Sequence, residues 1–599
     1  MEDTKYQEVW DLDKLFPGGS ESHQLLEHIK ELKIKINKLH RKVSNFQPPH
    51  NVADSIKVAE LMEYIGTLRI HLSQANSFII CLLAQNPKER KATSLQSEIG
   101  HIGASFESLV HKTQKILQSI EGKFWKELLD SNLLSNYKFI LNEWRKQGEY
   151  QLNENEEKLV SDLMIDGYHS WGQFYNALIS ELKVHVSING TINELSVGQA
   201  IKLRSHSDVE VRKESHEALE KTWEEKEDLF SRILNHIAGF RLQVYKNKGI
   251  ENVLKEPLID NRIEEDTLDA MWGAVNKHKK TFTDYLDKKA EMLGETKLNA
   301  YNFWAPITEN KQQIDYKKAV DFVIKHLSEF GPELENFTLN AFEKGWVESE
   351  NRSNKSAVAF CAGFPLIEES RIFMTYGGSI NDVLTLTHEL GHAYHNYAMK
   401  DVDGLNRHYP MSLAETASTF SEMIVLDAAI EKTTSNEEKI FLLDEKLKRS
   451  VMNFMNIYSR FLFEQNFYQE RKQGFVTPSR LNTLMKEAIN EAYNGSLGNA
   501  SAYSWVWTPH YYITKSPFYN FPYTFGYLFS LCIYAKAKEK GKEFEREYLA
   551  LLRDSGRMST ENLVMKYLEE DITSELFWEK GLRLCIKDVK EFIRLTENT

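Results

Sequence analysis

Cysteine, proline and glycine are all scarce in this chain of 599 residues. The four cysteines, at positions 81, 361, 532 and 585, show no C-x-x-C spacing, which argues against a disulfide framework or a cysteine-ligated zinc site. Proline and glycine together contribute 42 of the 599 residues, well below their share of an average globular protein. Because few residues favour turns, the sequence predicts long elements, and helices above all.

A surplus of basic charge and long apolar runs are also missing. The chain has 74 basic and 87 acidic residues, a net charge of −13, which would repel a phosphate backbone, so we expect no nucleic-acid partner. The first ten residues do not resemble a signal peptide, and the densest apolar run, 78–84, is too short to span a bilayer. We therefore expect a cytoplasmic protein that does not bind membranes.

Hydrophobic residues nevertheless make up 42% of the chain, enough for a large core, which excludes a disordered protein. From residue 20 to about 183 apolar residues recur at three- and four-residue spacing, which predicts amphipathic helices. The period changes to two at Val184 and Val186, and Asn189-Gly190 follows. This pattern predicts a β-hairpin near 184–195.

No linker rich in proline, glycine or serine divides the chain, so we expect lobes that share a core. We place an N-terminal helical region at 1–200, with the hairpin near its end, and a second region at 201–599. Within the latter, residues 357–376 contain two short β-like runs around Pro365, which predict two strands.

The segment after these strands carries the clearest chemical motif. Ser379 to Asp382 resembles a capping box, and the apolar spacing that follows predicts a helix to about Lys400. On that helix lies His388-Glu-Leu-Gly-His392. Residues four apart share a helix face, so both imidazoles can bind one metal ion. Glu389 can then accept a proton from a water molecule at the open coordination position of that metal.

A third metal ligand has to come from another element. His395 lies on the same helix as His388, but seven residues rise about 10.5 Å, too far for one metal to reach both with His392. A second predicted helix begins near 409 and carries Glu415 and Glu422. Glu415 would complete a two-His, one-Glu site of the catalytic type; alternatively, Ser412-x-x-Glu415 is a capping box that needs no metal.

These motifs resemble a known family. His388 to His395 together with Ala414 to Phe420 are similar to oligoendopeptidase F, of the thimet-oligopeptidase-like zinc metallopeptidases, and the resemblance extends to 357–376 and 230–249. It implies that Glu415 is the third zinc ligand. It also implies a mainly α fold of two helical lobes around a deep substrate channel, with a small β element near the zinc helix, and a catalytic domain at 201–599.

The sequence departs from the family pattern at two places. Val358-Ala359 stands where we expect glycines, and Asn302 stands where the family often has aspartate. Neither change affects a predicted metal ligand, so they bear on the shape of the substrate groove.

Aromatic residues are concentrated near the C-terminus, with 13 between Tyr503 and Tyr534. We expect most of them to pack in the core: Trp505, Trp507, Phe518, Phe521, Phe525 and Phe529. Asn520-Phe-Pro522 resembles a helix start. His510, Tyr519 and Tyr523 are similar to the histidine and two tyrosines with which the family contacts substrate and stabilises the transition state; Tyr512 and Tyr527 are lesser candidates.

The sequence thus predicts an endopeptidase for short unstructured oligopeptides, with one zinc ion per chain held by His388, His392 and Glu415. Glu389 is the expected general base, and His510, Tyr519 and Tyr523 are expected to contact the substrate. We expect Glu422 and Asp382 to orient the ligands.

Other readings of the motifs remain open. Cobalt or manganese would accept the same ligands as zinc, and the sequence does not give the oligomeric state. One rival is a carboxylate-bridged di-iron protein, because Glu389-x-x-His392 and Glu98-x-x-His101 are both E-x-x-H motifs. Another rival is a helical protein that binds peptides without cleaving them.

Overall fold

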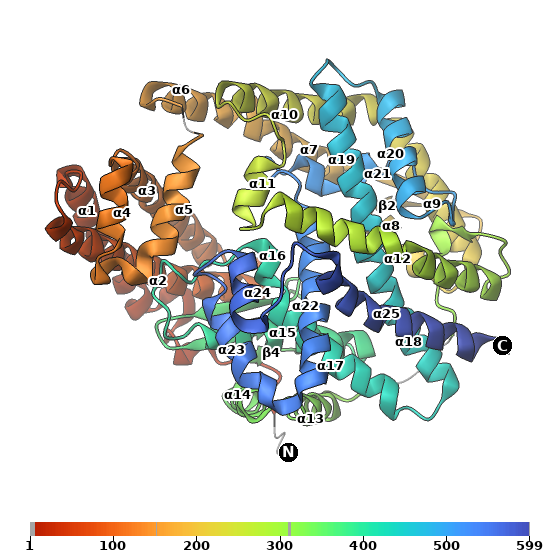
Figure 1. The fold of residues 1–599 in the computed structure, drawn as a ribbon. Coiled ribbons are helices and arrows are strands. Elements are labelled where there is room, and N and C mark those ends of the chain that lie inside the picture. Colours follow the sequence, from red (N-terminus) through yellow and green to blue (C-terminus); the bar gives the residue numbers. More distant parts are fainter. Residues whose placement is uncertain (1–5, 151, 309–312, 598–599) are drawn as a thin grey trace. The chain divides into compact units, whose positions relative to one another are not determined.

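A computed structural model describes residues 6–150, 152–308 and 313–597 (Figure 1). The chain forms two compact units, each assembled from segments far apart in the sequence. Unit 1 comprises Met1–Glu149, Gln312–Ala428 and Lys536–Glu570, and unit 2 comprises Tyr150–Lys311, Ala429–Ala535 and Asp571–Thr599. Helices dominate both units, which confirms the mainly α class. The division at residue 200 and the substrate channel stay predictions.

Unit 1 contains the N-terminal helices and the HExxH segment. Its helices are α1 (His23–Asn45), α2 (Ser55–Gln85), α3 (Arg90–Gln118), α4 (Gly122–Leu129), α5 (Lys138–Gly148), α13 (Tyr316–Leu327), α14 (Pro332–Glu343), α15 (Ile380–Ala398), α16 (Met411–Ala414), α17 (Thr416–Lys432), α23 (Phe544–Asp554) and α24 (Thr560–Leu568). The unit boundary falls near the end of α17.

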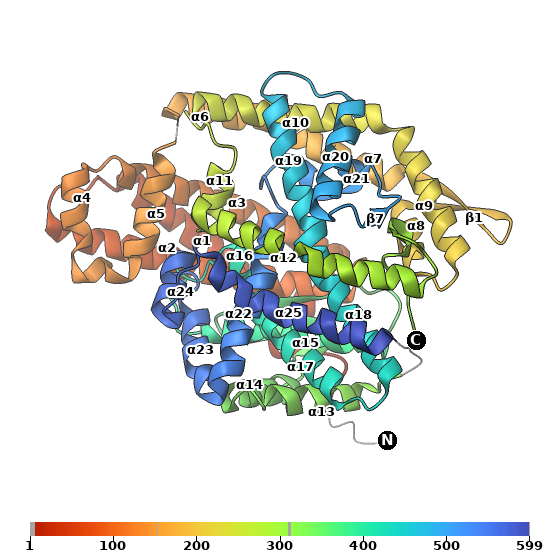
Figure 2. The ribbon, with the colours of Figure 1, turned by 45° about the vertical axis from the view of Figure 1, so that its right-hand side comes forward.

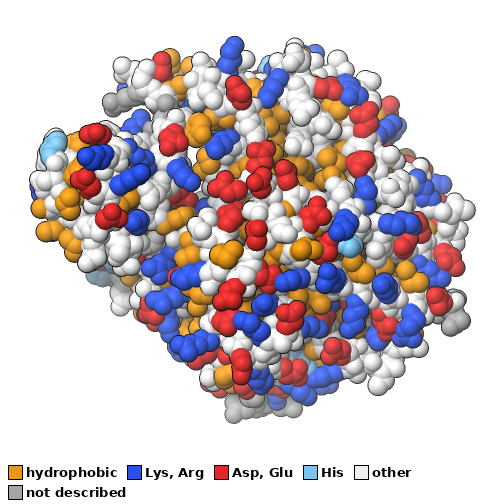
Figure 3. Space-filling view, viewed as in Figure 1, with side chains coloured by type: hydrophobic (Ala, Val, Ile, Leu, Met, Phe, Trp, Pro, Cys, Tyr) orange, Lys and Arg blue, Asp and Glu red, His pale blue; other side chains and the backbone are white. Residues whose placement is uncertain are grey.

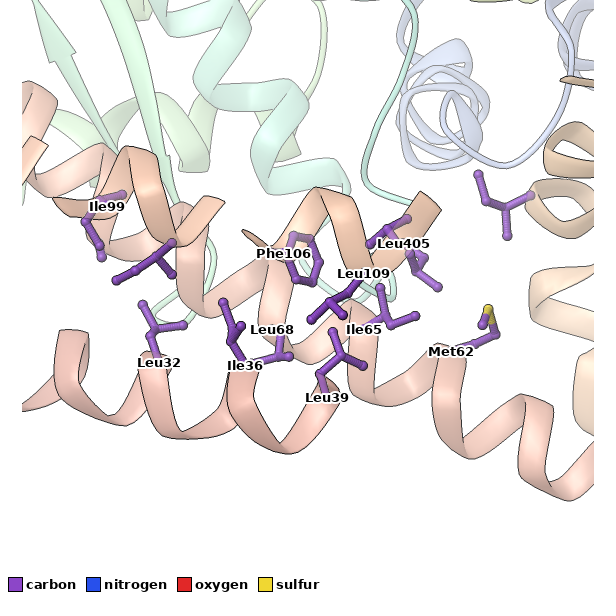
Figure 4. Packing of buried hydrophobic residues seen from close by; sticks show 14 of the residues in the cluster. Leu32, Ile36, Leu39, Met62, Ile65, Leu68, Ile99, Phe106, Leu109 and Leu405 are labelled. Atoms are coloured by element: carbon purple, nitrogen blue, oxygen red, sulfur yellow. The ribbon is translucent and has the colours of Figure 1, made fainter. Parts of the chain in front are cut away.

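The first three helices are amphipathic, as the sequence predicts, and their apolar faces pack against one another. Leu32 and Leu39 of α1, Ile65 of α2 and Phe106 of α3 are all buried in one cluster (Figure 4). Leu405, from the segment that follows α15, belongs to the same cluster. The N-terminal helices and the HExxH segment therefore share a core.

A small sheet lies beside the HExxH helix. β5 (Phe360–Phe364) pairs antiparallel with β6 (Glu369–Phe373), and β4 (Val347–Glu348) pairs parallel with β6. α15 packs against both β5 and β6. The two strands predicted around Pro365 and the β element near the zinc helix are thus confirmed.

Unit 2 is also helical. Its helices are α6 (Glu154–Met164), α7 (Ser170–Glu181), α8 (Val197–Lys202), α9 (Val209–Glu224), α10 (Glu227–Asn247), α11 (Lys255–Asp260), α12 (Glu265–Met292), α18 (Asn436–Val451), α19 (Ile457–Arg471), α20 (Pro478–Ala492), α21 (Ser504–Trp507), α22 (Phe521–Lys540) and α25 (Glu575–Thr596). The boundary with unit 1 falls near the end of α22. α12 and α25 run side by side (Figure 2).

The predicted hairpin is present in unit 2. β1 (Lys183–Ile188) pairs antiparallel with β2 (Thr191–Ser196), and β1 packs against α9 (Figure 2). Asn189 and Gly190 form the turn with φ of 53° and 76°, the left-handed conformation that Asn-Gly favours. A further short parallel pair joins β3 (Leu298–Asn299) to β7 (Leu497–Gly498).

Charged side chains of both signs are interspersed over much of the face in Figure 3. Among the described residues, no helix is both long and apolar enough to cross a membrane.

The four cysteines are free thiols, and Cys361 alone of them is partly exposed.

Candidate metal centre and active site

The HExxH helix, α15, begins where the capping box predicts. The Ser379 hydroxyl accepts a hydrogen bond from the Asp382 N–H, and the Asp382 carboxylate accepts one from the Ser379 N–H. Ile380, Leu384 and Leu390 on this helix are buried. The core thus fixes which face of α15 carries the two histidines.

Three potential metal ligands converge beside α15. The Nε2 atoms of His388 and His392 lie 3.1 Å apart, and the Oε2 atom of Glu415 lies 3.3 Å from the former and 3.6 Å from the latter. All three side chains are about three-quarters buried. In the part of the chain that the structure describes, this is the one group of three or more such residues that could hold a metal ion.

The spacing of these atoms fits a tetrahedral zinc ion. Zinc binds nitrogen and oxygen about 2.0–2.1 Å away, so two of its tetrahedral ligands lie roughly 3.3 Å apart. The observed separations of 3.1, 3.3 and 3.6 Å are close to this value. Two nitrogens and one carboxylate oxygen are also the donors that suit zinc with one position left open.

Each histidine also has a partner outside the cluster of ligand atoms. His388 Nδ1 lies 2.5 Å from Glu422 Oε1, and His392 makes a hydrogen bond to the backbone of Ala414. Such contacts fix the tautomer and the orientation of a metal-binding imidazole. The Ser418 hydroxyl in turn donates to Glu415 Oε2 at 2.7 Å.

Glu415 and Glu422 reach α15 because α15 and α17 approach closely at Gly391. A Cβ atom built on Gly391 would lie 2.4 Å from the Ala417 carbonyl oxygen and 2.5 Å from the Ser418 Cα. Both neighbours are backbone atoms, so neither can rotate away. The glycine in His-Glu-Leu-Gly-His therefore permits the approach that completes the site.

We expect Gly391→Ala to destabilise the fold by about 1–3 kcal/mol because the added methyl group overpacks the contact between α15 and α17. Metal affinity should fall with it. Thermal unfolding and zinc titration would measure both effects.

Gly100→Ala is the matched control. Gly100 is an exposed helical glycine of α3 with no atom within 4 Å of its added Cβ, so alanine should stabilise the helix by about 1 kcal/mol. Equal stability of the Gly391→Ala variant and the wild type would contradict the close approach.

Glu389 lies next to the ligands and has a distinctive environment. It is buried, with 5% of its surface exposed, and its Oε2 atom has no hydrogen-bond partner among the described residues. Burial raises the pKa of Glu389 to about 7, with His388 opposing and Glu415 adding to the effect. A buried carboxylate oxygen without a partner is the arrangement expected of a base that awaits a water molecule.

The carboxylates give the site an excess of negative charge. Burial favours the neutral ring of His388, yet the hydrogen bond to Glu422 and the nearby carboxylates raise its pKa to about 9. Burial and the charge on His388 lower the pKa of His392 to about 4. A cation bound between the rings and Glu415 would compensate this charge.

The structure also decides between several alternatives. His395 is fully buried, stacks on Tyr409 and lies 2.8 Å from the Ser555 hydroxyl, so it does not join the cluster. Glu415 stands between α16 and α17, while Ser412 lies inside α16 after its N-cap, Pro410. The capping-box alternative for Ser412 and Glu415 is therefore wrong.

Asp382 belongs to the helix cap rather than to the cluster. Its carboxylate accepts hydrogen bonds from the Gly377 and Ser379 backbone N–H groups and from the Ser379 hydroxyl. Of the two carboxylates expected to orient ligands, Glu422 contacts a histidine and Asp382 caps α15.

The second E-x-x-H motif forms no metal group with described residues. Glu98 is paired instead with Lys33 at 2.6 Å, and His101 is exposed on α3. The structure therefore gives no support to the di-iron alternative.

His510, Tyr519 and Tyr523 lie together in unit 2. Their ring centroids are 5.5 to 5.9 Å apart in all three pairs. Each is partly exposed, whereas the adjacent Phe518 and Asn520 are buried. α22 begins at Phe521, so Tyr519 precedes this helix and Tyr523 lies in its first turn, as the sequence predicts.

The lesser candidates belong to the core. Tyr512 stacks on Tyr175 at 3.8 Å and donates to the Trp505 carbonyl oxygen, and Tyr527 lies 3.0 Å from the Ser450 hydroxyl. The aromatic residues assigned to the core are buried, except Trp507, which is partly exposed. The guanidinium groups of Arg204 and Arg460 lie over the Trp507 ring.

Residues that sequence reasoning missed include Ser418 and Ala414, which contact Glu415 and His392, respectively. Ser418 lies three residues after Glu415, so helical spacing could have indicated it. Ala414 acts through its backbone, for which a sequence carries no signal.

The chain is similar to known peptidases. Residues 202–584 match the family model described as peptidase family M3, and residues 117–183 match the one described as oligopeptidase F. An oligoendopeptidase F homolog of Lactococcus lactis subsp. lactis (strain IL1403) is 24% identical over 98% of this chain and 97% of its own. Oligopeptidase PepF of Bacillus subtilis (strain 168) is 22% identical over 96% of this chain and 85% of its own.

A solved structure shows the same fold. The crystal structure of oligoendopeptidase-F from Enterococcus faecium matches with a TM-score of 0.69 and 18% identity, covering 96% of this chain and 99% of that chain.

Proposed function

Because the chain belongs to peptidase family M3 and is thus a metallopeptidase that hydrolyses peptide bonds, we propose that it is a zinc-dependent endopeptidase. Its substrates would be short, unstructured oligopeptides cut at internal bonds. The observation that carries the proposal is the cluster of His388, His392 and Glu415 with the buried carboxylate of Glu389 beside it.

His388, His392 and Glu415 would hold one zinc ion per chain, leaving one position open. When bound, zinc lowers the pKa of a coordinated water toward about 7 and polarises a carbonyl group. Glu422 keeps the His388 ring in place by its contact with Nδ1.

Glu389 acts as the general base and then as the general acid. Its Oε2 atom, buried without a partner among the described residues, accepts the proton of the attacking water. The same carboxyl group then passes that proton to the leaving amine.

His510, Tyr519 and Tyr523 would bind the peptide and donate hydrogen bonds to the oxygen on which negative charge develops. A ring N–H and two phenolic O–H groups are suitable donors, and all three side chains are accessible from solvent. We place the activity in the cytoplasm.

We expect the metal-loaded protein to cut a pool of short peptides at internal bonds, as read by mass spectrometry. Treatment with a chelator should abolish the cuts because it removes the metal ion that activates the attacking water. Adding back zinc should restore them.

Cuts that persist after complete metal removal would contradict the metal dependence. Bound zinc with peptide binding but no cuts would indicate a binding protein instead. Cuts restored better by cobalt or manganese than by zinc would contradict the choice of metal.

A further inference from the structure

The segment that carries His510, Tyr519 and Tyr523 has little regular structure of its own. It contains the 3-10 helix Pro509–Tyr512 and then no helix until α22 begins at Phe521. An irregular segment does not by itself hold side chains in one orientation. Two charged residues of α19, both in unit 2, provide that support.

Arg460 contacts the ring of His510. Its Nη1 atom lies 3.1 Å from His510 Nδ1. A guanidinium group has only donors, so Nδ1 must accept and can carry no proton. The remaining proton of the neutral ring is therefore on Nε2, which faces away from Arg460.

The electrostatics agree with this assignment. Burial and, next, the charge of Arg460 lower the pKa of His510 to about 4. The ring is thus neutral at pH 7. A proton on Nδ1 would face the guanidinium, which explains why the charged ring is unfavourable beside it.

Glu464 lies one helical turn after Arg460 and holds the other end of the segment. Its Oε1 atom accepts a hydrogen bond from the Phe518 backbone N–H at 3.1 Å, and its Oε2 atom accepts one from Asn520 Nδ2 at 2.6 Å. Phe518 has a φ of 53°, a left-handed conformation that a phenylalanine adopts only when its surroundings impose it. Glu464 is buried, with 3% exposed.

We propose that Arg460 and Glu464 are the positioning residues of the aromatic site, by which we mean His510, Tyr519 and Tyr523. Arg460 fixes His510 as a neutral Nε2–H donor, and Glu464 anchors the residues on either side of Tyr519. The inference rests on the proposed function, in which His510 contacts the substrate. It defines the role of His510, because a ring fixed in this way donates a hydrogen bond to a carbonyl oxygen and does not accept a proton at Nε2.

A double-mutant cycle tests the role of Arg460. The probe is a fluorogenic peptide chosen from those that the zinc-loaded wild type cuts. We expect Arg460→Met to lower kcat about 10-fold with little change in KM, because the ring loses its fixed orientation. In a His510→Ala background the same change should alter kcat less than about two-fold.

Two further variants serve as controls. Arg460→Lys keeps a cationic donor and should retain more activity than Arg460→Met. Arg232→Met removes an exposed arginine of α10 and should leave kcat unchanged. If Arg460→Met does not fold, as judged by thermal unfolding, Arg460→Leu, which also lacks a donor, replaces it in the cycle.

An equal loss of kcat with and without His510, or no loss in either background, would overturn the proposal for Arg460. So would equal losses in the lysine and methionine variants. If the wild type itself cuts no peptide while holding zinc, the proposed function fails instead, and the two failures are thereby distinguished.

Glu464 is tested in the same way. Glu464→Gln keeps an acceptor for the Phe518 N–H but offers none to Asn520, so we expect kcat to fall about 10-fold. In a Tyr519→Phe, Tyr523→Phe background the change should have less than about a two-fold effect. An undiminished effect in that background would overturn the anchoring role.

Discussion

Glu389→Gln is expected to abolish most peptide hydrolysis while zinc remains bound. Glutamine has nearly the same shape as glutamate but cannot accept the proton of the attacking water, so kcat should fall about 10²–10⁴-fold. The three proposed ligands are unchanged, so metal content should stay at one zinc per chain. Peptide turnover and mass-spectrometric metal analysis of the same sample measure both quantities.

Glu127→Gln is the matched control for this variant. Glu127 is an exposed residue of α4 in the same unit, and its replacement should leave both turnover and zinc content unchanged. A Glu389→Gln protein that cuts peptides at close to the wild-type rate would show that another group is the base.

His388→Ala is expected to lose both zinc and activity. Replacing a residue that only orients a ligand, such as Glu422, lowers metal affinity about 10–100-fold, so removing a ligand should lower it more. We therefore expect zinc to be lost on dialysis of His388→Ala and to be held more weakly, but still held, by Glu422→Ala. Metal content after dialysis against buffers of rising chelator strength would rank the variants.

His101→Ala is the control for the loss of a histidine. His101 is exposed on α3 and belongs to the second E-x-x-H motif, so its removal should not change the metal content. One equivalent of zinc retained by His388→Ala would rule out His388 as a ligand, and metal lost from His101→Ala would revive the di-iron alternative.

Local patterns predicted the elements of this fold well. The spacing of Leu25, Ile29 and Leu32 marks the buried face of α1, and the Asn189-Gly190 turn marks the hairpin. In each case the residues that form the pattern lie within the helix or hairpin that the pattern predicts. The capping box at Ser379 places the start of α15 for the same reason.

The candidate site was predictable to the extent that it is local. His388 and His392 lie four residues apart on one helix, so their spacing alone indicates a shared face, and Glu389 lies next to the first of them. Glu415 was one of two readings until the resemblance favoured it as a ligand, because it stands at a break between two helices and reaches the histidines only through the close contact at Gly391. No spacing rule encodes a contact between two separate helices.

The contacts that Arg460 and Glu464 make with the aromatic site could not be predicted from local sequence patterns. Arg460 and His510 are 50 residues apart, and Glu464 and Phe518 are 54 apart. In the sequence, Arg460 and Glu464 read as an ordinary pair of opposite charges on a helix. The assembly of each unit from three distant segments could not be predicted for the same reason.

The most direct test of the account is a titration of the metal-free protein with zinc, followed by peptide hydrolysis. If His388, His392 and Glu415 form the one metal site that hydrolysis requires, activity should rise in proportion to zinc and level off at one equivalent per chain. Activity that is full before zinc is added, or that rises until two equivalents are bound, would contradict it.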